Sequence, residues 1–511
     1  MYALPDATKD TRFGQLVGSF QGQKTRCRIY ACNPQDLIDY SVEANVVNYG
    51  TLLKYNANDT DSNSRIASSG LKFTEYFNKD TDRAIGLTAT TQISVSFVND
   101  DGAMSSFHWD YDAVVYLDIY DSTNSEWLSC PLGVFDWEMP DQLSSVIVSA
   151  KANNFMQRLG KIESSISLVD YSNSPDLYDI TYGCYGGGGT IEGITWGITR
   201  ESKYFPMLNY TYSAIPYDDS GMSARDSLGL IAEINYKNAY VDRNASLKFR
   251  SWAYLPDNPS RPDAHVVKTF SADITPSHIG SLQIAEYDVP TVNRVIADIG
   301  QIGAKGDSSS GNGFEAFHIY DNGWFRPKDQ VQGLCLSIRS NLQYLFDTTY
   351  RPMTVELCEG DPRLEGGDLV NIVKDGVTYL LPIFQQTIEW KGGGFKQTLI
   401  STGRRSRRDG DFTSSASHNV SSRIYNASSQ AGIITASSVA SGSTSDIPVT
   451  FDVPFNKNPI VVASIFSSQT IGMGQCSASV YNITTTGCSI RLTNGYSSAR
   501  NLGATWIAVS Q

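Results

Sequence analysis

Apolar and polar residues alternate in many short stretches of this chain, and turn-forming residues separate these stretches. In residues 92–98 every second side chain is apolar, and an Asn-Asp-Asp-Gly turn follows at 99–102. A period of two is typical of a strand with one buried face. The pattern recurs on both sides of a turn at 121–125, so we expect residues 1–160 to form a first β-barrel domain.

The middle of the chain, residues 161–350, mixes helical and strand-like patterns. Apolar spacings of three and four predict a helix over residues 224–236. Ser223 and Asp226 have the spacing of a capping box, with Asp in place of the usual Glu or Gln. A second helix is predicted over residues 330–346, so this region is expected to be a mixed α/β domain.

Strand patterns return in residues 351–403, where short apolar runs flank turns that contain glycine. One hairpin is expected across the Asp375-Gly376 turn and another across the glycines at 392–394. Hairpins in close succession, with little sequence between them, are typical of a small closed sheet. Residues 351–403 are therefore predicted to form a second β-barrel.

The composition changes after residue 403. Residues 404–446 open with the basic run Arg404–Arg408 and are rich in Ser, Thr and Ala, so we interpret them as a linker or as a stalk packed against copies of itself. The basic run is interpreted as solvated, with contact to acidic groups of a neighbouring protein or to DNA as the alternative. Residues 447–511 are predicted to form a β-sandwich. The predicted fold class is mainly β with α+β insertions: two β-barrels, a mixed α/β middle and a C-terminal β-sandwich.

Charge and composition exclude several classes of function. The chain has 40 Lys and Arg against 53 Asp and Glu, a formal charge of −13. A surface of that sign repels phosphate, so we expect no nucleic-acid recognition. No run of about 18 apolar residues predicts a membrane span, and the first residues lack the features of a secretory signal. The eight cysteines are scattered, so no disulfide framework is expected.

No catalytic motif is present, and we predict neither an enzyme nor a cofactor or metal site. The five histidines have no metal-ligand spacing. Asp59–Asn63 is similar to the start of a calcium loop, but Ser64 and Gly70 stand where such a loop has glycine and glutamate, so a polar loop is expected.

Three carboxylates lie on or near one predicted strand. Asp110, Asp112 and Asp118 are all even-numbered and share one face of a strand. A solvated barrel face explains them. The alternative is the carboxylate pair of a glycosidase.

The loop before the last strand contains the candidate glycan-binding residues Tyr496, Arg500 and Asn501. A planar ring that stacks on a sugar, with Arg and Asn as hydrogen-bond donors, is the chemistry that such a site needs. A plain polar loop is the alternative. Trp506 alternates with Ala508 on an apolar strand and is interpreted as core.

Three passages together resemble the hub, or tail-tip, proteins of long-tailed bacteriophages. They are Cys130–Phe135 with residues 146–150 after it, Arg351–Asp368, and the closing hairpin at 392–403. The resemblance covers roughly residues 1–404. It implies two hub-type barrels that alternate around the axis of a homotrimer, in a ring that adapts the tail tube to the tip.

Residues 447–511 are similar to H-type lectin-like modules at the ends of phage fibres. The residues that carry this similarity are Val449–Phe451 with Phe455, Pro459–Val462, Thr485–Cys488 and Trp506–Val509, and Ser510 stands where the usual closing glycine would be. The similarity implies a trimeric β-sandwich that binds glycans.

These resemblances predict a structural baseplate hub at the tail tip of the virion, made in the host cytoplasm. The expected partners are two further copies of the chain, the distal tail protein ring, the tape-measure protein and a host-surface glycan. The alternative is a secreted carbohydrate-binding enzyme or adhesin, which would need an export signal.

Overall fold

A computed structural model describes residues 1–511 except for a set of segments whose placement is left out. These segments are 18–23, 37, 55–63, 78–85, 87, 186, 188–189, 192, 199, 201–210, 213–221, 236, 252–265, 275–276, 290–293, 300–303, 308–315, 321, 325–330, 342–348, 359, 392–393, 404–411, 414–428, 452–457, 467–474 and 510–511.

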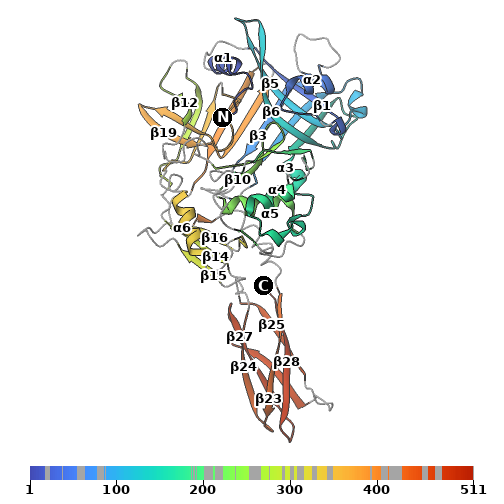
Figure 1. The fold of residues 1–511 in the computed structure, drawn as a ribbon, viewed down its shortest axis with the longest axis vertical. Coiled ribbons are helices and arrows are strands. Elements are labelled where there is room, and N and C mark those ends of the chain that lie inside the picture. Colours follow the sequence, from blue (N-terminus) through green and yellow to red (C-terminus); the bar gives the residue numbers. More distant parts are fainter. Residues whose placement is uncertain are drawn as a thin grey trace. The chain divides into compact units, whose positions relative to one another are not determined.

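The chain divides into two compact units. Unit 1 is Met1–His418 without residues 300–303, and unit 2 is essentially Asn419–Gln511. In unit 1 the described helices and strands (Figure 1) are α1 (Ala7–Val17), β1 (Thr25–Cys32), α2 (Glu43–Tyr49), β2 (Thr51–Lys54), β3 (Ile66–Tyr76), β4 (Thr90–Val98), β5 (Asp112–Asp121), β6 (Glu126–Glu138), β7 (Ile147–Asn154), α3 (Met156–Leu159), α4 (Leu177–Tyr185), β8 (Thr190–Ile191), β9 (Ile194–Trp196), α5 (Ala224–Ile234), β10 (Asn238–Val241), β11 (Ser246–Arg250), β12 (Val266–Ser271), β13 (Ile279–Ile284), β14 (Arg294–Ile299), β15 (Ala304–Asp307), β16 (Ala316–Tyr320), α6 (Val331–Asn341), β17 (Met353–Leu357), β18 (Leu369–Lys374), β19 (Val377–Pro382), β20 (Gln385–Lys391), β21 (Gly394–Ser401) and β22 (Phe412–Thr413).

One large sheet organises unit 1. It has eleven strands in the order β13-β17-β21-β20-β3-β4-β7-β6-β5-β1-β2. A large apolar cluster that includes Phe73, Phe97, Phe135 and Trp390 packs against it. The prediction that the chain is mainly β is therefore confirmed.

The predicted closure into two barrels is wrong for the residues that the structure describes, because none of their sheets closes. β20, from the predicted second barrel, pairs with β3 from the predicted first barrel, with Ile388 opposite Phe73. The two regions thus share one open sheet. The hairpin expected across Asp375-Gly376 is present as β18–β19, but it belongs to a separate three-stranded sheet with β12.

Local predictions in the middle region are confirmed. The side chain of Ser223 accepts a hydrogen bond from the Asp226 backbone N–H at 3.1 Å, which caps α5. α5 buries almost every residue from Ala224 to Ile234. The second expected helix is present as α6, and residues 342–346 of that prediction lie outside the described residues.

Unit 2 contains two three-stranded sheets, β23-β28-β25 and β24-β27-β26. They enclose a shared core that includes Phe451, Ile490, Leu492 and Trp506, so the expected core position of Trp506 is confirmed. Residues 429–439, within the stretch interpreted as a linker, form a strand paired with β28. Small residues suit that strand because Trp506 packs closely over Gly432. The strands of unit 2 are β23 (Ser429–Val439), β24 (Thr444–Thr450), β25 (Ile460–Phe466), β26 (Cys476–Tyr481), β27 (Gly487–Asn494) and β28 (Arg500–Val509).

Candidate functional sites

The loop between β27 and β28 holds Tyr496 in place through a buried asparagine. The side chain of Asn494 is fully buried and donates hydrogen bonds to the carbonyl oxygens of Val439 at 2.8 Å and Ser498 at 2.9 Å. Its Oδ1 accepts from the Tyr496 backbone N–H at 3.0 Å. Because the amide is satisfied on both sides, the loop backbone is anchored from within the module. Tyr496 is presented half-buried at the surface.

The structure brings Tyr496 and Arg500 together. The Arg500 guanidinium lies over the Tyr496 ring, 4.6 Å from its centroid, in cation–π geometry. Neighbouring side chains in a strand point to opposite faces, and Asn501 accepts a hydrogen bond from the Ser438 backbone N–H at 2.8 Å. Its amide therefore lies with β23 and apart from the Tyr496–Arg500 pair. The pair offers an aromatic surface and guanidinium donors, which suit a saccharide ring and its hydroxyls.

A second polar cluster in unit 2 was missed by the sequence analysis. Arg491 makes a two-point ion pair with Asp446 at 2.7 and 2.8 Å and lies over the ring of Tyr481, 4.9 Å from its centroid. Hydrogen bonds from Arg491 and then Tyr481 lower the pKa of Asp446 to about 2. Asp446 and Arg491 are register partners on β24 and β27, and only knowledge of that register could have paired them. The three side chains satisfy one another across the outer face of this sheet.

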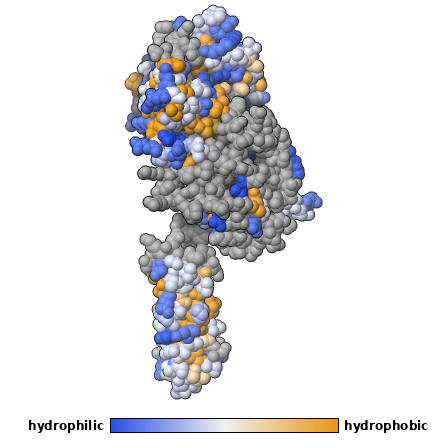
Figure 2. Space-filling model, turned by 90° about the vertical axis from the view of Figure 1, so that its left-hand side faces the viewer, coloured by the Kyte–Doolittle hydropathy of each residue, from blue (hydrophilic) through white to orange (hydrophobic). Residues whose placement is uncertain are grey.

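The other sheet of unit 2 carries an exposed apolar surface, which we call the apolar face. Val462 lies opposite Ile507, and Ile460 lies opposite Val509. These four side chains are between 40% and 64% exposed. Figure 2 shows hydrophobic and polar surface interspersed on one side of this module. A patch of this kind on a small module marks an interaction surface. The apolar face consists of Ile433, Ile460, Val462, Phe466, Ile507 and Val509.

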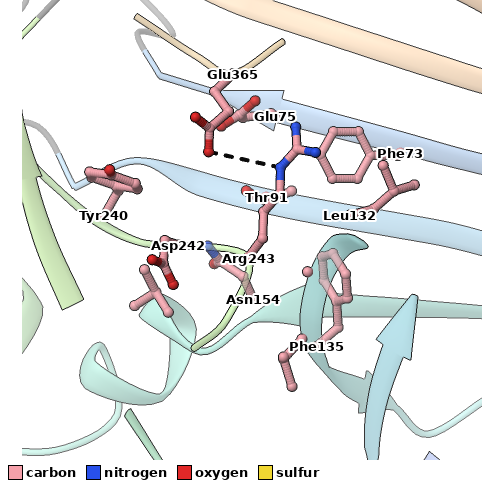
Figure 3. Close-up of a pocket in the computed structure, with 13 residues that line it drawn as sticks. Phe73, Glu75, Thr91, Leu132, Phe135, Asn154, Tyr240, Asp242, Arg243 and Glu365 are labelled. Carbon is pink, nitrogen blue, oxygen red and sulfur yellow. Dashed lines mark ion pairs between the residues drawn. The ribbon is translucent and has the colours of Figure 1, made fainter. Parts of the chain in front are cut away.

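A small pocket in unit 1 surrounds the buried guanidinium of Arg243, which belongs to the turn between β10 and β11 (Figure 3). Arg243 donates hydrogen bonds to the carbonyl oxygens of Pro131 at 2.9 Å, Pro362 at 2.8 Å and Leu364 at 2.7 Å. It also forms an ion pair with Glu365 at 3.9 Å. These contacts join two of the three passages that carry the hub resemblance. The cavity of about 20 Å³ is sufficient for a water molecule and too small for a metabolite.

The buried charged groups that line this pocket interact with one another and with the backbone of β6. Burial raises the pKa of Glu75, partly offset by the charge of Arg243 and a hydrogen bond from Gln386. Leu132 is the additional residue of a bulge in β6, since Val115 pairs with Gly133 and Tyr116 with Pro131. The bulge tolerates a proline inside a strand and leaves its carbonyl for Arg243.

The expected solvated face of Asp110, Asp112 and Asp118 is wrong for two of the three residues. Asp118 is fully buried and accepts hydrogen bonds from Arg26 and Arg28, both at 2.5 Å. Asp112 is buried and accepts from Arg158 and the Tyr40 hydroxyl, also at 2.5 Å. The reason is that β5 is buried on both faces, with buried side chains at nearly every position, so its even-numbered side is covered as well. Only Asp110 is solvated, with 80% of its side chain exposed.

Several other expectations fall partly or wholly outside the described residues. The acidic run 59–63, the basic run 404–408, Phe455 and Ser510 are in the segments that are left out. In the described part of the chain, no group of three or more His, Cys, Asp or Glu residues is arranged to hold a metal ion. Within the same residues, every helix is too short or too polar to cross a membrane. None of the eight cysteines, all of which are among the described residues, forms a disulfide.

Comparison with protein families supports the similarity of unit 2 to H-type lectin-like modules. Residues 446–509 match the model of the H-type lectin domain. No curated protein matches the chain in sequence.

Three solved structures are similar to this chain over part of its length. The 43 kDa tail protein of prophage MuSo2 from Shewanella oneidensis is 8% identical with a TM-score of 0.38, over 75% of this chain and 97% of that chain. Prophage tail protein gp18 from Listeria monocytogenes is 10% identical with a TM-score of 0.39, over 75% and 95%. The R1 pyocin fibre of P. aeruginosa is 11% identical with a TM-score of 0.14, over 32% and 58%.

Proposed function

We propose that this chain is a non-catalytic structural protein of a bacteriophage tail whose C-terminal module binds a saccharide of the host surface. In the finer form of the proposal it is the trimeric baseplate hub at the tail tip and contacts the distal tail ring and the tape-measure protein. The observation that carries the saccharide part is the H-type lectin match over residues 446–509. The hub part rests on the three sequence passages that resemble hub proteins.

The Tyr496–Arg500 pair supports the saccharide site. The ring gives a surface for the C–H face of a sugar, and the five N–H donors of a guanidinium are groups of the kind that bind sugar hydroxyls. Sites of this kind are individually weak, and a trimer would present three of them to one surface. Linked weak sites gain strength through effective concentration, which fits a module that attaches a large particle to a cell.

The apolar face supports assembly. Six large apolar side chains on one sheet of a small module are costly to leave in water, at about 25 cal/mol per Å² of apolar surface. A module of this size also gains stability from association, because it buries a smaller share of its surface than a larger domain does. We infer that copies of unit 2 pack through this face.

The alternative of a secreted carbohydrate-active enzyme depended on carboxylates that are free to exchange protons. Asp112 and Asp118 are buried in contacts with arginines, which hold both carboxylates in ion pairs. Neither fits the role of a glycosidase acid. We therefore do not adopt this alternative.

A saccharide array with labelled full-length chain tests the binding site. Tyr496→Ala and Arg500→Gln are expected to weaken the strongest array signal by roughly tenfold, the effect of losing about one stacking or charged contact. Tyr481→Ala is the matched control, because Tyr481 also lies under an arginine in the same module but on the other sheet. Array binding that neither Tyr496→Ala nor Arg500→Gln reduces would contradict the assignment.

A further inference from the structure

A cluster of three aromatic rings lies at the surface of unit 1, far in sequence from the C-terminal module. Tyr178 and Tyr182 are one helical turn apart on α4, and their rings are parallel within 5°, with centroids 6.0 Å apart. Trp196 from β9 stands nearly perpendicular to both, with centroids at 5.9 Å from Tyr178 and 5.5 Å from Tyr182. Three rings in these edge-on and parallel geometries stabilise one another's positions.

The local sequence explains why these rings face outward. α4 buries Leu177, Ile180, Thr181, Cys184 and Tyr185, which form a buried stripe beside the two tyrosines on the helix. Tyr182 is left 42% exposed, and Gly183 beside it is also exposed. The indole N–H of Trp196 is buried and has no acceptor among the described residues. The ring of Trp196 is partly buried and contacts both tyrosine rings edge-on.

A polar rim borders the rings. The Arg200 guanidinium lies 5.5 Å from the centroid of Tyr178. It forms ion pairs with Asp176 at 2.7 Å and with Asp179. Asp176 is nearly buried and also caps α4 by accepting from the Asp179 backbone N–H at 3.0 Å. Asp179 and Arg200 are 42% and 51% exposed, so an acceptor and a donor group stand side by side near the ring of Tyr178, which stacks with Tyr182.

We propose that the Tyr178–Tyr182–Trp196 cluster with Asp179 and Arg200 is a second binding site, for a neutral saccharide, in unit 1. A pyranose has an apolar C–H face that fits the exposed tyrosine ring, and hydroxyls that both donate to Asp179 and accept from Arg200. Two carboxylates against one guanidinium leave the rim negative, which disfavours phosphorylated or carboxylated sugars. The exposed aromatic area is one side chain wide, which matches a sugar ring better than a protein partner, whose interface needs about 800 Å² on each side.

This site goes beyond the proposed function, since it requires neither the lectin-like module nor assembly. The experiment uses the full-length chain with Tyr496→Ala, so that the C-terminal site is already weakened. The probes are methyl glycosides of glucose, galactose, N-acetylglucosamine and N-acetylgalactosamine together with their neutral oligosaccharides, followed by saturation-transfer NMR. A sialylated and a phosphorylated saccharide serve as charged probes.

The expected result is a neutral saccharide that still receives magnetisation from the Tyr496→Ala chain. Adding Tyr182→Ala or Asp179→Asn should weaken its binding by roughly tenfold, whereas Tyr182→Phe should retain most of it. Tyr49→Ala is the matched control, because Tyr49 on α2 is 61% exposed in the same unit and lies outside the cluster. The exposed position of Tyr182 makes Tyr182→Ala a mild change for folding, and an unchanged thermal unfolding curve checks this.

Three outcomes would overturn the proposal: no neutral probe binds the Tyr496→Ala chain, binding survives both Tyr182→Ala and Asp179→Asn, or only the charged probes bind. These outcomes are separable from failure of the C-terminal site. That failure would leave the wild-type saccharide signal unchanged by Tyr496→Ala but sensitive to Tyr182→Ala.

Discussion

Removal of the Arg243 guanidinium tests the junction that joins the two hub-like passages of unit 1. Arg243→Met keeps an unbranched apolar stem and removes the donors to the Pro131, Pro362 and Leu364 carbonyl oxygens. Each buried carbonyl without a donor costs about 1–3 kcal/mol. Relaxation and water entry recover part of this, so we expect a loss of about 3–5 kcal/mol, as for other broken buried ion pairs.

Urea unfolding followed by tryptophan fluorescence measures this loss. Arg243→Lys should give an intermediate value, because an ammonium keeps the charge beside Glu365 but cannot contact three carbonyls in fixed directions. Arg351→Met is the control, since its ion pair with Asp288 is at the surface and should contribute little. An Arg243→Met chain that unfolds at the wild-type urea concentration would refute the structural role of this junction.

The loss of stability caused by Arg243→Met should also depend on pH. The charge of Arg243 lowers the pKa of Glu75, which burial raises overall. Without Arg243 the pKa of Glu75 should rise further. A carboxyl group with a raised pKa in the folded state contributes stability below its unfolded pKa and loses it as the pH rises through the folded pKa. The Arg243→Met deficit should therefore be larger in mildly alkaline than in mildly acidic solution.

Three further predictions follow from buried and surface contacts. Burial opposes ionisation of Asp361, but Arg363 and Lys268 outweigh it and lower the pKa of Asp361 to about 2. The contribution of this carboxylate to the stability of the fold should therefore be lost as the pH falls toward that value. In calorimetry, Asp361→Asn should lower stability at neutral pH by about 3–5 kcal/mol. Carboxyl NMR titration should give Asp446 a pKa of about 2, and Arg491→Gln should return it toward the ordinary range; an unchanged value would refute the ion pair. Ile507→Asp on the apolar face should convert a trimer to monomers in light scattering, whereas Thr505→Asp, on the same face and also exposed, should have a smaller effect; a mass that Ile507→Asp leaves unchanged would exclude this face as the interface.

The local elements of this fold were predictable from the sequence, because their determinants are neighbours in the chain. The cap of α5 needs only Ser223 and Asp226, and the β18–β19 hairpin needs only the turn at Asp375-Gly376. Alternation in residues 92–98 likewise marks β4, in which Ile93, Val95 and Phe97 are buried.

Sheet closure and long-range pairing were not predictable in this way. Whether hairpins close on themselves or join another sheet depends on partners such as β3 and β20, which are separated by most of unit 1. The burial of Asp112 and Asp118 was not predictable either, because β5 is covered on both faces, and a solvated strand and a covered one can share the same alternation.

In the candidate sites too, contacts between residues close in sequence were predictable, and contacts that depend on strand pairing were not. Tyr496 and Arg500 are close in sequence and meet in the structure. The side chain of Asn501 is directed elsewhere by a contact with Ser438 on a strand that composition had assigned to a linker. Asp446 and Arg491 meet only through strand register, so no sequence pattern could identify them as a pair.

The most direct test of the tail-protein assignment is the location of the chain in phage particles. Particles released by the cells that encode this chain can be labelled with an antibody against residues 446–509 and viewed by electron microscopy. The account predicts label at the distal end of the tail. Particles that lack the chain, or label along the tail tube or on the head, would contradict it.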